Sequence, residues 1–271
     1  MRKILIGFIS LSFLFGTVAT ACFPDKVPEI QINEKDGIYH IILNGKKISK
    51  KIQFVSSENL ITNRKAHEKF NSVLTINTGY FDPKNQKTIS YITENNGEKI
   101  LSPLDNENLL NNPVLAKNMD KIENRTEFRV LECGSKTKYE ITPHKTDVPE
   151  DCRIRTSAQG GPMVLPDLRL EEEFFVVKNS DGKVIRESAS VLHRCARTII
   201  GLKDNNIHIL IFTNKHPVNM SEVQDYCRDL KLDSAMGFDG GSSTSMNYED
   251  LEVVSAKDSG RLLKSFLIIE K

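Results

Sequence analysis

The chain has 271 residues, with 37 Lys and Arg residues against 36 Asp and Glu residues. A formal net charge of +1 provides no large basic surface, so nucleic acid is not expected as a partner. Hydrophobic residues make up 39% of the chain, and 15 Gly and 10 Pro are typical of a folded protein rather than a disordered or collagen-like one.

The first 21 residues have the pattern of a secretory signal peptide. Arg2 and Lys3 precede an apolar run over residues 4–15, and small residues then lead to Ala21. The run is shorter than the roughly 20 residues that a membrane-spanning helix needs. We therefore predict a signal peptide at 1–21 and an exported protein that is periplasmic, secreted or anchored by a lipid to the cell envelope.

The next residue is Cys22, and two fates are open for it. Residues 19–22 resemble a bacterial lipobox, in which the cysteine is lipidated, although Ala19 stands where leucine is usual. The same residues suit ordinary cleavage, which leaves Cys22 as a free thiol. Lipidation of Cys22 is the one route to membrane anchoring that the sequence suggests.

The other four cysteines are expected to form two disulfides. An exported protein folds in an oxidising compartment, where an odd thiol is disfavoured. Four cysteines allow three pairings, and a loop of about 20 residues closed by one of them would contribute roughly 3 kcal/mol. We predict the pairs Cys133–Cys152 and Cys195–Cys227.

The remaining sequence predicts mostly short strands. Residues 22–36 are polar and are expected to be an exposed lead-in to one domain over 37–271. β-Branched and aromatic runs between turn residues predict strands at 38–43, 52–55, 73–76, 251–254 and 265–269, the last two on either side of a turn around 258–260. Residues 197–203 and 207–213 are predicted to form a hairpin with a three-residue loop.

Helices are expected at two places. In 221–230, Ser221 and Gln224 have the spacing of a capping box, and apolar residues then recur at intervals of three and four. A second helix is expected from about 58 to 70. The sequence thus predicts a single-domain α+β fold, with a mixed or antiparallel twisted β-sheet and a few packed helices.

Common catalytic and metal-binding motifs are absent from the sequence. It contains no Cys-x-x-Cys, His-Glu-x-x-His, EF-hand loop or Gly-x-Ser-x-Gly elbow. We therefore expect no cofactor and no metal site. A bound divalent cation would have no motif to support it.

Three other segments combine glycine with polar residues. Residues 75–82 run from a strand into a polar turn, and residues 157–164 place paired glycines before a proline, where a backbone can approach a ligand closely. Taken alone, both segments are better explained as structural turns. In residues 235–246, an apolar strand ends in Asp239, followed by two glycines and four hydroxyl residues. Exposed amides in such a loop can bind an anion, so this segment favours a functional site.

In this order, the three segments resemble the phosphodiester glycosidase family from about residue 72 to the C-terminus. Residues 238–246 match a family pattern of apolar-Asp-Gly-Gly-Gly-Ser-Thr-x-Met, with Ser242 in place of the third glycine. The family's Asn-x-Gly-x-Phe motif maps onto 77–81 and its Gln-x-Gly-Pro motif onto 159–162. Its Arg-Thr-x-x-Gly strand maps onto 197–201, where Ala196 replaces a frequent proline.

The resemblance implies hydrolysis of a sugar phosphodiester at the anomeric carbon, with release of sugar and a phosphomonoester. Asp239 would be the catalytic carboxylate, as nucleophile or base, and Arg197 a bidentate clamp on the phosphate. We expect these two residues to share one cleft with Asn77, which requires their strands to be sheet neighbours. The residues expected to bind substrate are Asn77, Gly79, Gln159, Gly161, Gly240, Gly241, Ser243 and Thr244.

A non-catalytic envelope protein is the alternative, because related folds do not guarantee a shared activity. Such a protein would bind phosphorylated glycans or peptidoglycan at the same loop. The expected partner of the enzyme is a small-molecule or glycan phosphodiester. The presence of Asn77, Arg197 and Asp239 favours the enzyme.

Overall fold

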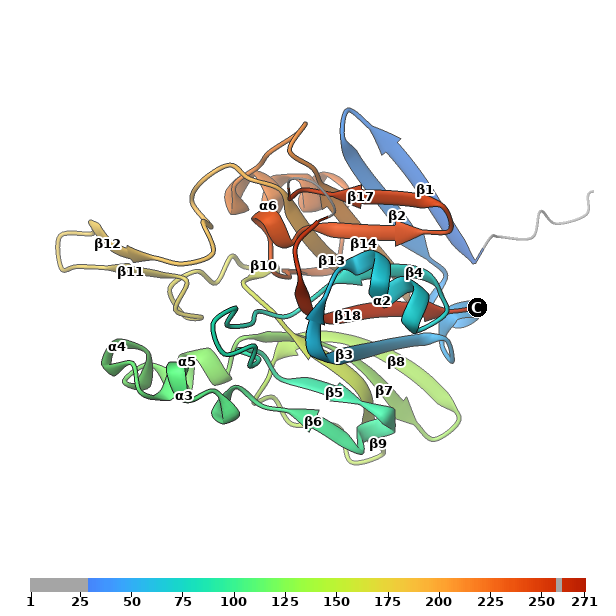
Figure 1. Ribbon diagram of the computed structural model, residues 1–271, viewed down its shortest axis with the longest axis horizontal. Helices are drawn as coiled ribbons and strands as arrows, with labels where there is room; N and C mark the ends of the chain where they lie inside the picture. Colours follow the sequence, from blue (N-terminus) through green and yellow to red (C-terminus); the bar gives the residue numbers. More distant parts are fainter. Residues whose placement is uncertain (1–28, 257–259) are drawn as a thin grey trace, which may run out of the picture.

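Three antiparallel sheets pack around a shared apolar core in the computed structural model, which describes residues 29–256 and 260–271 (Figure 1). The predicted signal peptide, Cys22 and most of the predicted turn at 258–260 lie outside these residues. Among the residues described, no helix has the length and apolar character needed to cross a bilayer. The antiparallel sheets and short helices agree with the predicted α+β class.

The first sheet contains the predicted hairpin, with β13 and β14 paired along their whole length. Lys203 pairs with Asn206, so the loop has two residues rather than the predicted three. The sheet also contains β1, where the sequence suggested an exposed lead-in. Most side chains of residues 30–35 are exposed, but the segment forms a strand that was not predicted, because its amides and carbonyls pair with β2. In spatial order, the strands are β1 (Ile30–Lys35), β2 (Ile38–Leu43), β14 (Asn206–Phe212), β13 (Arg197–Lys203), β15 (Ser234–Gly237) and β10 (Met163–Leu165).

The second sheet brings the end of the chain beside an early strand. Its order is β17 (Leu251–Val254), β16 (Ser245–Tyr248), β4 (Ser72–Asn77), β18 (Leu263–Glu270) and β3 (Ile52–Ile61). The predicted strands at 251–254 and 265–269 are therefore present, but they do not pair with each other. Instead, β18 lies between β4 and β3, and β17 pairs with β16.

The third sheet has β7 and β9 near its centre. Its order is β6 (Lys99–Leu101), β5 (Ile92–Glu94), β9 (Cys152–Gln159), β7 (Thr126–Cys133) and β8 (Lys136–Pro143). The three sheets meet at Phe54, whose ring lies 5.9 Å from that of Phe128 and 6.2 Å from that of Phe238. Each of these rings comes from a different sheet or the loop after it, so burying them fixes how the sheets are arranged.

The helices are short, and α6 alone has ten residues. Its cap differs from the prediction: Asn219 and Glu222 form the capping box, while Gln224 is buried and donates to the Val164 carbonyl (2.9 Å). The predicted helix at 58–70 is shorter, because 58–61 extend β3. The helices are α1 (Gly45–Ile48), α2 (Asn63–Lys69), α3 (Glu107–Leu110), α4 (Pro113–Ala116), α5 (Met119–Glu123) and α6 (Met220–Asp229), with 3₁₀ turns η1 (Asn95–Gly97), η2 (Pro103–Asp105) and η3 (Gly241–Ser243).

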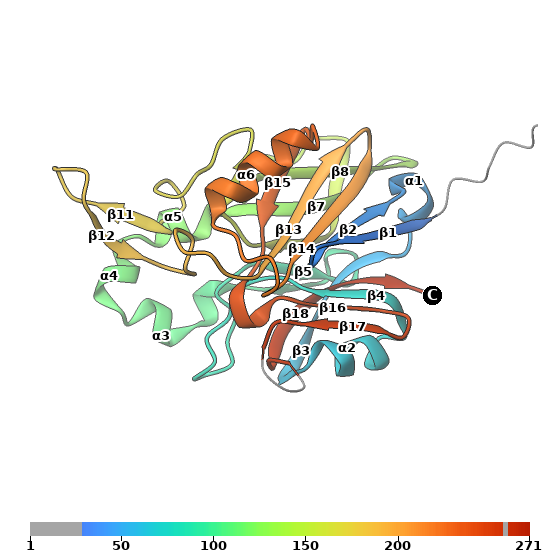
Figure 2. The same cartoon turned by 90° about the horizontal axis from the view of Figure 1, so that it is seen from above.

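Two segments project from the same end of the molecule. One carries α3, α4 and α5, and the other is a two-stranded ribbon of β11 (Val176–Lys178) and β12 (Val184–Glu187) (Figures 1 and 2). Side chains from both segments pack together in a small apolar cluster that includes Leu109, Ile122 and Phe174. This packing makes the two segments neighbouring walls at one end of the sheets.

Only one of the two predicted disulfides is present. Cys133 and Cys152 lie opposite each other on β7 and β9 and are bonded, as predicted. Cys195 and Cys227 are free thiols, so this predicted pair is wrong. Cys227 faces the apolar core under α6, whereas the backbone of Cys195 pairs with Val218. Burial raises the pKa of the Cys227 thiol to about 12, which keeps it protonated.

Mass mapping after alkylation should verify this pairing. Without reductant, denatured protein should be labelled at Cys195 and Cys227, and reduction should add Cys133 and Cys152. Replacing the bonded pair with serine should lower the free energy of unfolding by about 3 kcal/mol, because the disulfide restricts the unfolded chain. A peptide that links Cys195 to Cys227 would contradict the structure.

Candidate active site

Asn77, at the end of β4, holds the predicted segments together. Its Nδ2 donates to the backbone oxygen of Asp239 (2.6 Å), and its Oδ1 accepts from the Thr198 hydroxyl (2.7 Å) and the Ser245 amide (3.1 Å). The Asp239 amide in turn donates to the Thr78 carbonyl (2.9 Å). The side chain is 1% exposed and engaged with the protein. In this structure it positions the loop that carries Asp239, and its contact with a sugar stays a prediction.

Arg197 lies next to this loop, but its guanidinium is bound to the protein. The strands β13 and β15 are sheet neighbours, as expected, and a Cβ on Gly240 would lie 3.5 Å from Nη1 of Arg197. However, the guanidinium donates to four backbone carbonyls, at 2.6–3.1 Å: those of Val218, Ala189, Ser190 and His193. These contacts leave no free fork for a phosphate. Arg197 therefore braces the surrounding loops, contrary to the clamp expected from the sequence.

The amides of the glycine loop are also engaged. Gly241 donates to the Ala196 carbonyl (2.8 Å), Ser243 to that of Gly240 (3.1 Å), and Thr244 to that of Gly241 (3.2 Å). These three amides are therefore not free to bind an anion. The loop instead fixes the direction of the Asp239 side chain, which also accepts a hydrogen bond from the Ser243 hydroxyl.

Asp239 is partly exposed to solvent, but its carboxyl group is closely surrounded by protein atoms. Burial raises the pKa of Asp239 to about 6, although the Ser243 hydroxyl, the Arg261 charge and the Gly240 amide each favour the ionised form. A carboxyl with this pKa is ionised at neutral pH and can still exchange a proton, as general bases require.

Asp239 lines a cavity of about 200 Å³ at the projecting end of the molecule. Most of its wall is aromatic or aliphatic, as is usual for pockets that bind small molecules. Within the described chain, Asp239 is the one carboxylate in the lining, and two arginines join it. The other lining residues are Tyr80, Ile89, Leu109, Leu115, Ile122, Arg125, Phe175, Arg186, Ser188 and Ala189.

Arg125 presents a free guanidinium fork to this cavity. Its Nε donates to the Glu173 carbonyl (3.0 Å), and the guanidinium carbon lies 4.1 Å from the centre of the Phe175 ring. Neither terminal nitrogen has a hydrogen-bond partner in the described part of the chain. Burial lowers the pKa of Arg125 to about 10, so it is cationic at neutral pH. A planar cation with two open donors fits a phosphate group.

The glutamine of the Gln-x-Gly-Pro segment holds the backbone at Arg125. Gln159 is fully buried, and its Nε2 donates to the carbonyls of Ile122 (3.3 Å), Glu123 (2.7 Å) and Arg125 (3.3 Å). It therefore ties the end of α5 to β9. Contact between Gln159 and a sugar stays a prediction, because these bonds already engage its amide nitrogen.

Two predicted glycines permit close packing beside the cavity. A Cβ on Gly79 would lie 2.8 Å from the Cβ of Ser90, and one on Gly161 would lie 2.2 Å from Oε2 of Glu173. Gly161 also has φ +92, and its carbonyl accepts from the Tyr80 hydroxyl (3.0 Å). Glu173 itself is fully engaged with neighbouring donors, so it supports this wall rather than facing the cavity.

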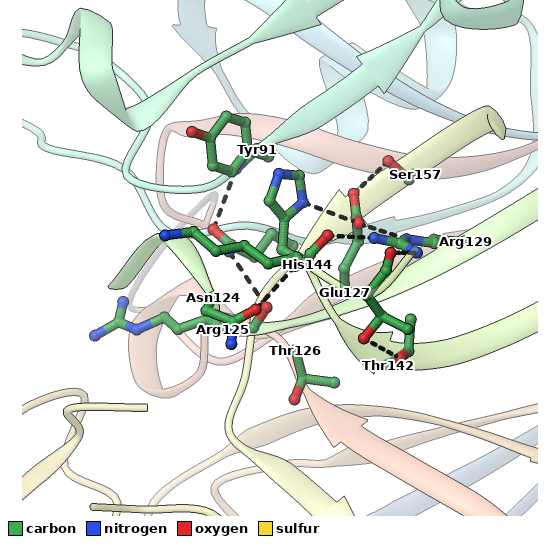
Figure 3. A network of polar contacts seen from close by, with 12 residues as sticks. Tyr91, Asn124, Arg125, Thr126, Glu127, Arg129, Thr142, His144 and Ser157 are labelled. Carbon is green, nitrogen blue, oxygen red and sulfur yellow. Dashed lines mark hydrogen bonds and ion pairs between the residues drawn. The ribbon is translucent and has the colours of Figure 1, made fainter. Parts of the chain in front are cut away.

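A buried polar network supports the chain from which Arg125 extends (Figure 3). Glu127 accepts hydrogen bonds from Nε of Arg129 (2.8 Å) and from the Ser157 hydroxyl (2.5 Å), and it contacts Nδ1 of His144 (3.0 Å). Burial would raise the pKa of Glu127, but these partners outweigh it and hold the pKa below its ordinary value. The His144 amide also donates to the Arg125 carbonyl (3.1 Å). The network thus anchors the cavity's cation to the third sheet.

Sequence patterns did not identify Arg125 and Arg186 as residues of this site. They are two of 37 basic residues, and neither lies in a motif. Tyr80 lies within a recognised segment, but its hydroxyl had no assigned role. Across the described ranges, no three His, Cys, Asp or Glu side chains gather in a way that could hold a metal ion.

Comparisons with known proteins identify the fold and the family of the chain. The structure resembles the catalytic domain of zebrafish N-acetylglucosamine-1-phosphodiester α-N-acetylglucosaminidase, described as auto-inhibited by its pro-peptide (TM-score 0.62, 11% identity, covering 89% of this chain and 81% of that one). It also resembles a protein from Burkholderia pseudomallei described as exported (TM-score 0.53, 11% identity, covering 86% and 74%). Among curated proteins, none matches the sequence significantly. The phosphodiester glycosidase family model matches residues 70–270, so the chain belongs to the phosphodiester glycosidase family.

Proposed function

We propose that the protein hydrolyses a sugar-1-phosphodiester at the anomeric carbon, releasing the sugar and a phosphomonoester. The observation that carries this proposal is the cavity in which Asp239 and the open fork of Arg125 occur together. A single carboxylate and two arginines in a mostly apolar pocket suit a neutral sugar joined to an anionic phosphate. Family membership supports the same reaction.

The chemistry explains why one carboxylate suffices. A phosphomonoester is a weaker base than a sugar alkoxide, so the leaving group needs less help from a general acid than in an ordinary glycoside. Arg125 would stabilise the negative charge that the leaving phosphate gains. Ionised Asp239 would stabilise the oxocarbenium-like transition state, either as nucleophile or as the base that activates water.

We further propose that the protein acts outside the cytoplasm. This proposal rests on the predicted signal peptide and on the disulfide between Cys133 and Cys152, since such bonds persist in oxidising compartments. Membrane anchoring would occur through lipidated Cys22. The proposed partner is a small-molecule or glycan phosphodiester, and no nucleic acid is expected.

Asp239→Asn should lower kcat by about 10²–10⁴-fold, because the amide keeps the size of the side chain but not its charge. A panel of methyl sugar-1-phosphodiesters, assayed for free sugar, measures this. Binding of the hydrolysable ester should change by no more than a few fold. If Asp239 only braced its loop, binding and thermal stability would fall together with turnover.

The wild-type pH profile provides the control for this variant. Since the pKa of Asp239 is raised to about 6 and the ionised form acts, kcat/KM should increase with pH through about 6 and then level off. The raised pKa also means that ionising Asp239 disfavours the folded state as the pH rises. Asp239→Asn should therefore be at least as stable as wild type at pH 8. A less stable variant would support the non-catalytic alternative.

Arg125→Lys and Arg197→Lys form a matched pair. The first should raise KM about tenfold with little loss of stability, because lysine cannot present two parallel donors to a phosphate. The second should lower the free energy of unfolding by about 3 kcal/mol, because buried carbonyls lose charged donors. Urea unfolding and steady-state kinetics on both variants measure these effects. If Arg197→Lys raised KM without loss of stability and Arg125→Lys lowered stability instead, Arg197 would be the residue that binds the phosphate.

A further inference from the structure

A larger hollow adjoins the Asp239 cavity, between the α3–α5 segment and the β11–β12 ribbon. Its volume is about 650 Å³. We call it the outer groove, and it is lined by Asn112, Val114, Leu115, Asn118, Phe174, Val177, Ile185 and Arg186. Its walls are the two segments that project together in Figures 1 and 2. Five of the eight lining residues are apolar, and none is a carboxylate.

The outer groove and the Asp239 cavity are adjacent and share part of their walls. Leu115 and Arg186 line both of them, and therefore mark the junction. Nη1 of Arg186 donates to the Phe174 carbonyl (2.8 Å), and the guanidinium carbon lies 4.2 Å from the centre of the Phe174 ring. These contacts place a cation at the junction itself. A molecule that occupies both spaces would pass its anionic part beside Arg186.

The walls of the groove expose large apolar side chains from two separate segments. Val114 on α4 is 55% exposed, and Ile185 on β12 is 64% exposed. Single exposed apolar residues are ordinary on a protein surface. Here, however, the two side chains line one hollow that also contains Leu115, Val177 and Phe174. Apolar side chains that line a shared groove beside a catalytic cavity indicate an apolar ligand group.

We infer that the outer groove binds the alcohol side of the phosphodiester, and that this alcohol carries a long aliphatic chain. The inference rests on the proposed function, since it assumes a sugar at Asp239 and a phosphate near Arg125 and Arg186. The substrate class is then a sugar-1-phosphate ester of a lipid alcohol. The order of groups along the site is sugar, phosphate and aliphatic chain.

This order fits the balance of the reaction. Water adds to the anomeric carbon and the bond from that carbon to the phosphate oxygen breaks. The sugar leaves with a new hydroxyl, and the proton released from water goes to the phosphomonoester or to solvent. The ester bond to the aliphatic alcohol stays intact, so the product is an alkyl phosphate monoester. That product would keep both its anionic and its apolar contacts.

Binding of the product tests the groove without requiring turnover. Octyl phosphate, below its micelle concentration, and methyl phosphate are titrated calorimetrically into the full chain. Each fully buried methylene is worth about fourfold in affinity. Since the groove is open on one side, we expect octyl phosphate to bind at least tenfold more tightly than methyl phosphate.

Ile185→Asn should reduce this chain-length preference at least threefold and leave methyl phosphate affinity unchanged. Val184→Asn is the matched control, because Val184 is a 38% exposed neighbour on the same strand and does not line the groove. It should leave both affinities unchanged. Equal effects of the two variants would overturn the inference. So would a similar preference for octyl over methyl trimethylammonium, which would show that the apolar surface binds chains without regard to phosphate.

Two further experiments test whether the groove binds a membrane rather than a single substrate, and whether the proposed reaction occurs. If Ile185→Asn abolished binding to neutral phosphatidylcholine vesicles but not the octyl preference, the groove would be a membrane contact and the inference would fail. Methyl and octyl esters of the same sugar 1-phosphate are also compared as substrates. Equal kcat/KM for both would contradict this inference alone. Octyl preference in binding without hydrolysis of either ester would contradict the proposed reaction alone.

Discussion

The site depends on one buried amide, that of Asn77. Its three hydrogen bonds join the end of β4 to the Asp239 carbonyl, to Thr198 on β13 and to the amide of Ser245 at the start of β16. These groups belong to two different sheets and the loop between them. Each would be left unpaired in a buried place without Asn77, which is costly. The position of the Asp239 carboxylate is therefore set mainly by how the two sheets pack at Asn77, and the loop after Asp239 then orients the side chain.

A second support fixes the position of Arg125, which lines the same cavity as Asp239. Gln159 holds the backbone of 122–125, and the Glu127 network holds the following strand, so Arg125 extends from a chain that is fixed on both sides. Arg197 shows the contrasting case. Both are buried arginines beside the Asp239 loop or cavity, but four carbonyls engage Arg197. Arg125 lines the cavity, and within the described chain its terminal nitrogens have no hydrogen-bond partner. Which arginine can bind an anion is decided by the carbonyls around it, and not by its place in a motif.

Sequence patterns predicted the parts of this structure that depend on local periodicity. The hairpin of β13 and β14, the body of α6 and the meeting of the Asn77 and Asp239 segments are all present. Errors occurred where distant contacts decide the outcome. The polar strand β1 is held by backbone pairing with β2, and Cys227 points into a core that the spacing of cysteines does not reveal. Arg125 could not be chosen from the sequence, because its environment comes from α5, β7 and the 170–175 loop together.

The most direct test is to identify which bond breaks during hydrolysis. Hydrolysis in water enriched in ¹⁸O, followed by mass spectrometry of both products, locates the attacked atom. Attack at the anomeric carbon, with Asp239 beside it and the phosphate held by Arg125, predicts ¹⁸O in the released sugar and none in the phosphomonoester. If ¹⁸O appeared in the phosphomonoester instead, the enzyme would attack phosphorus, and the roles given to Asp239 and Arg125 would be wrong.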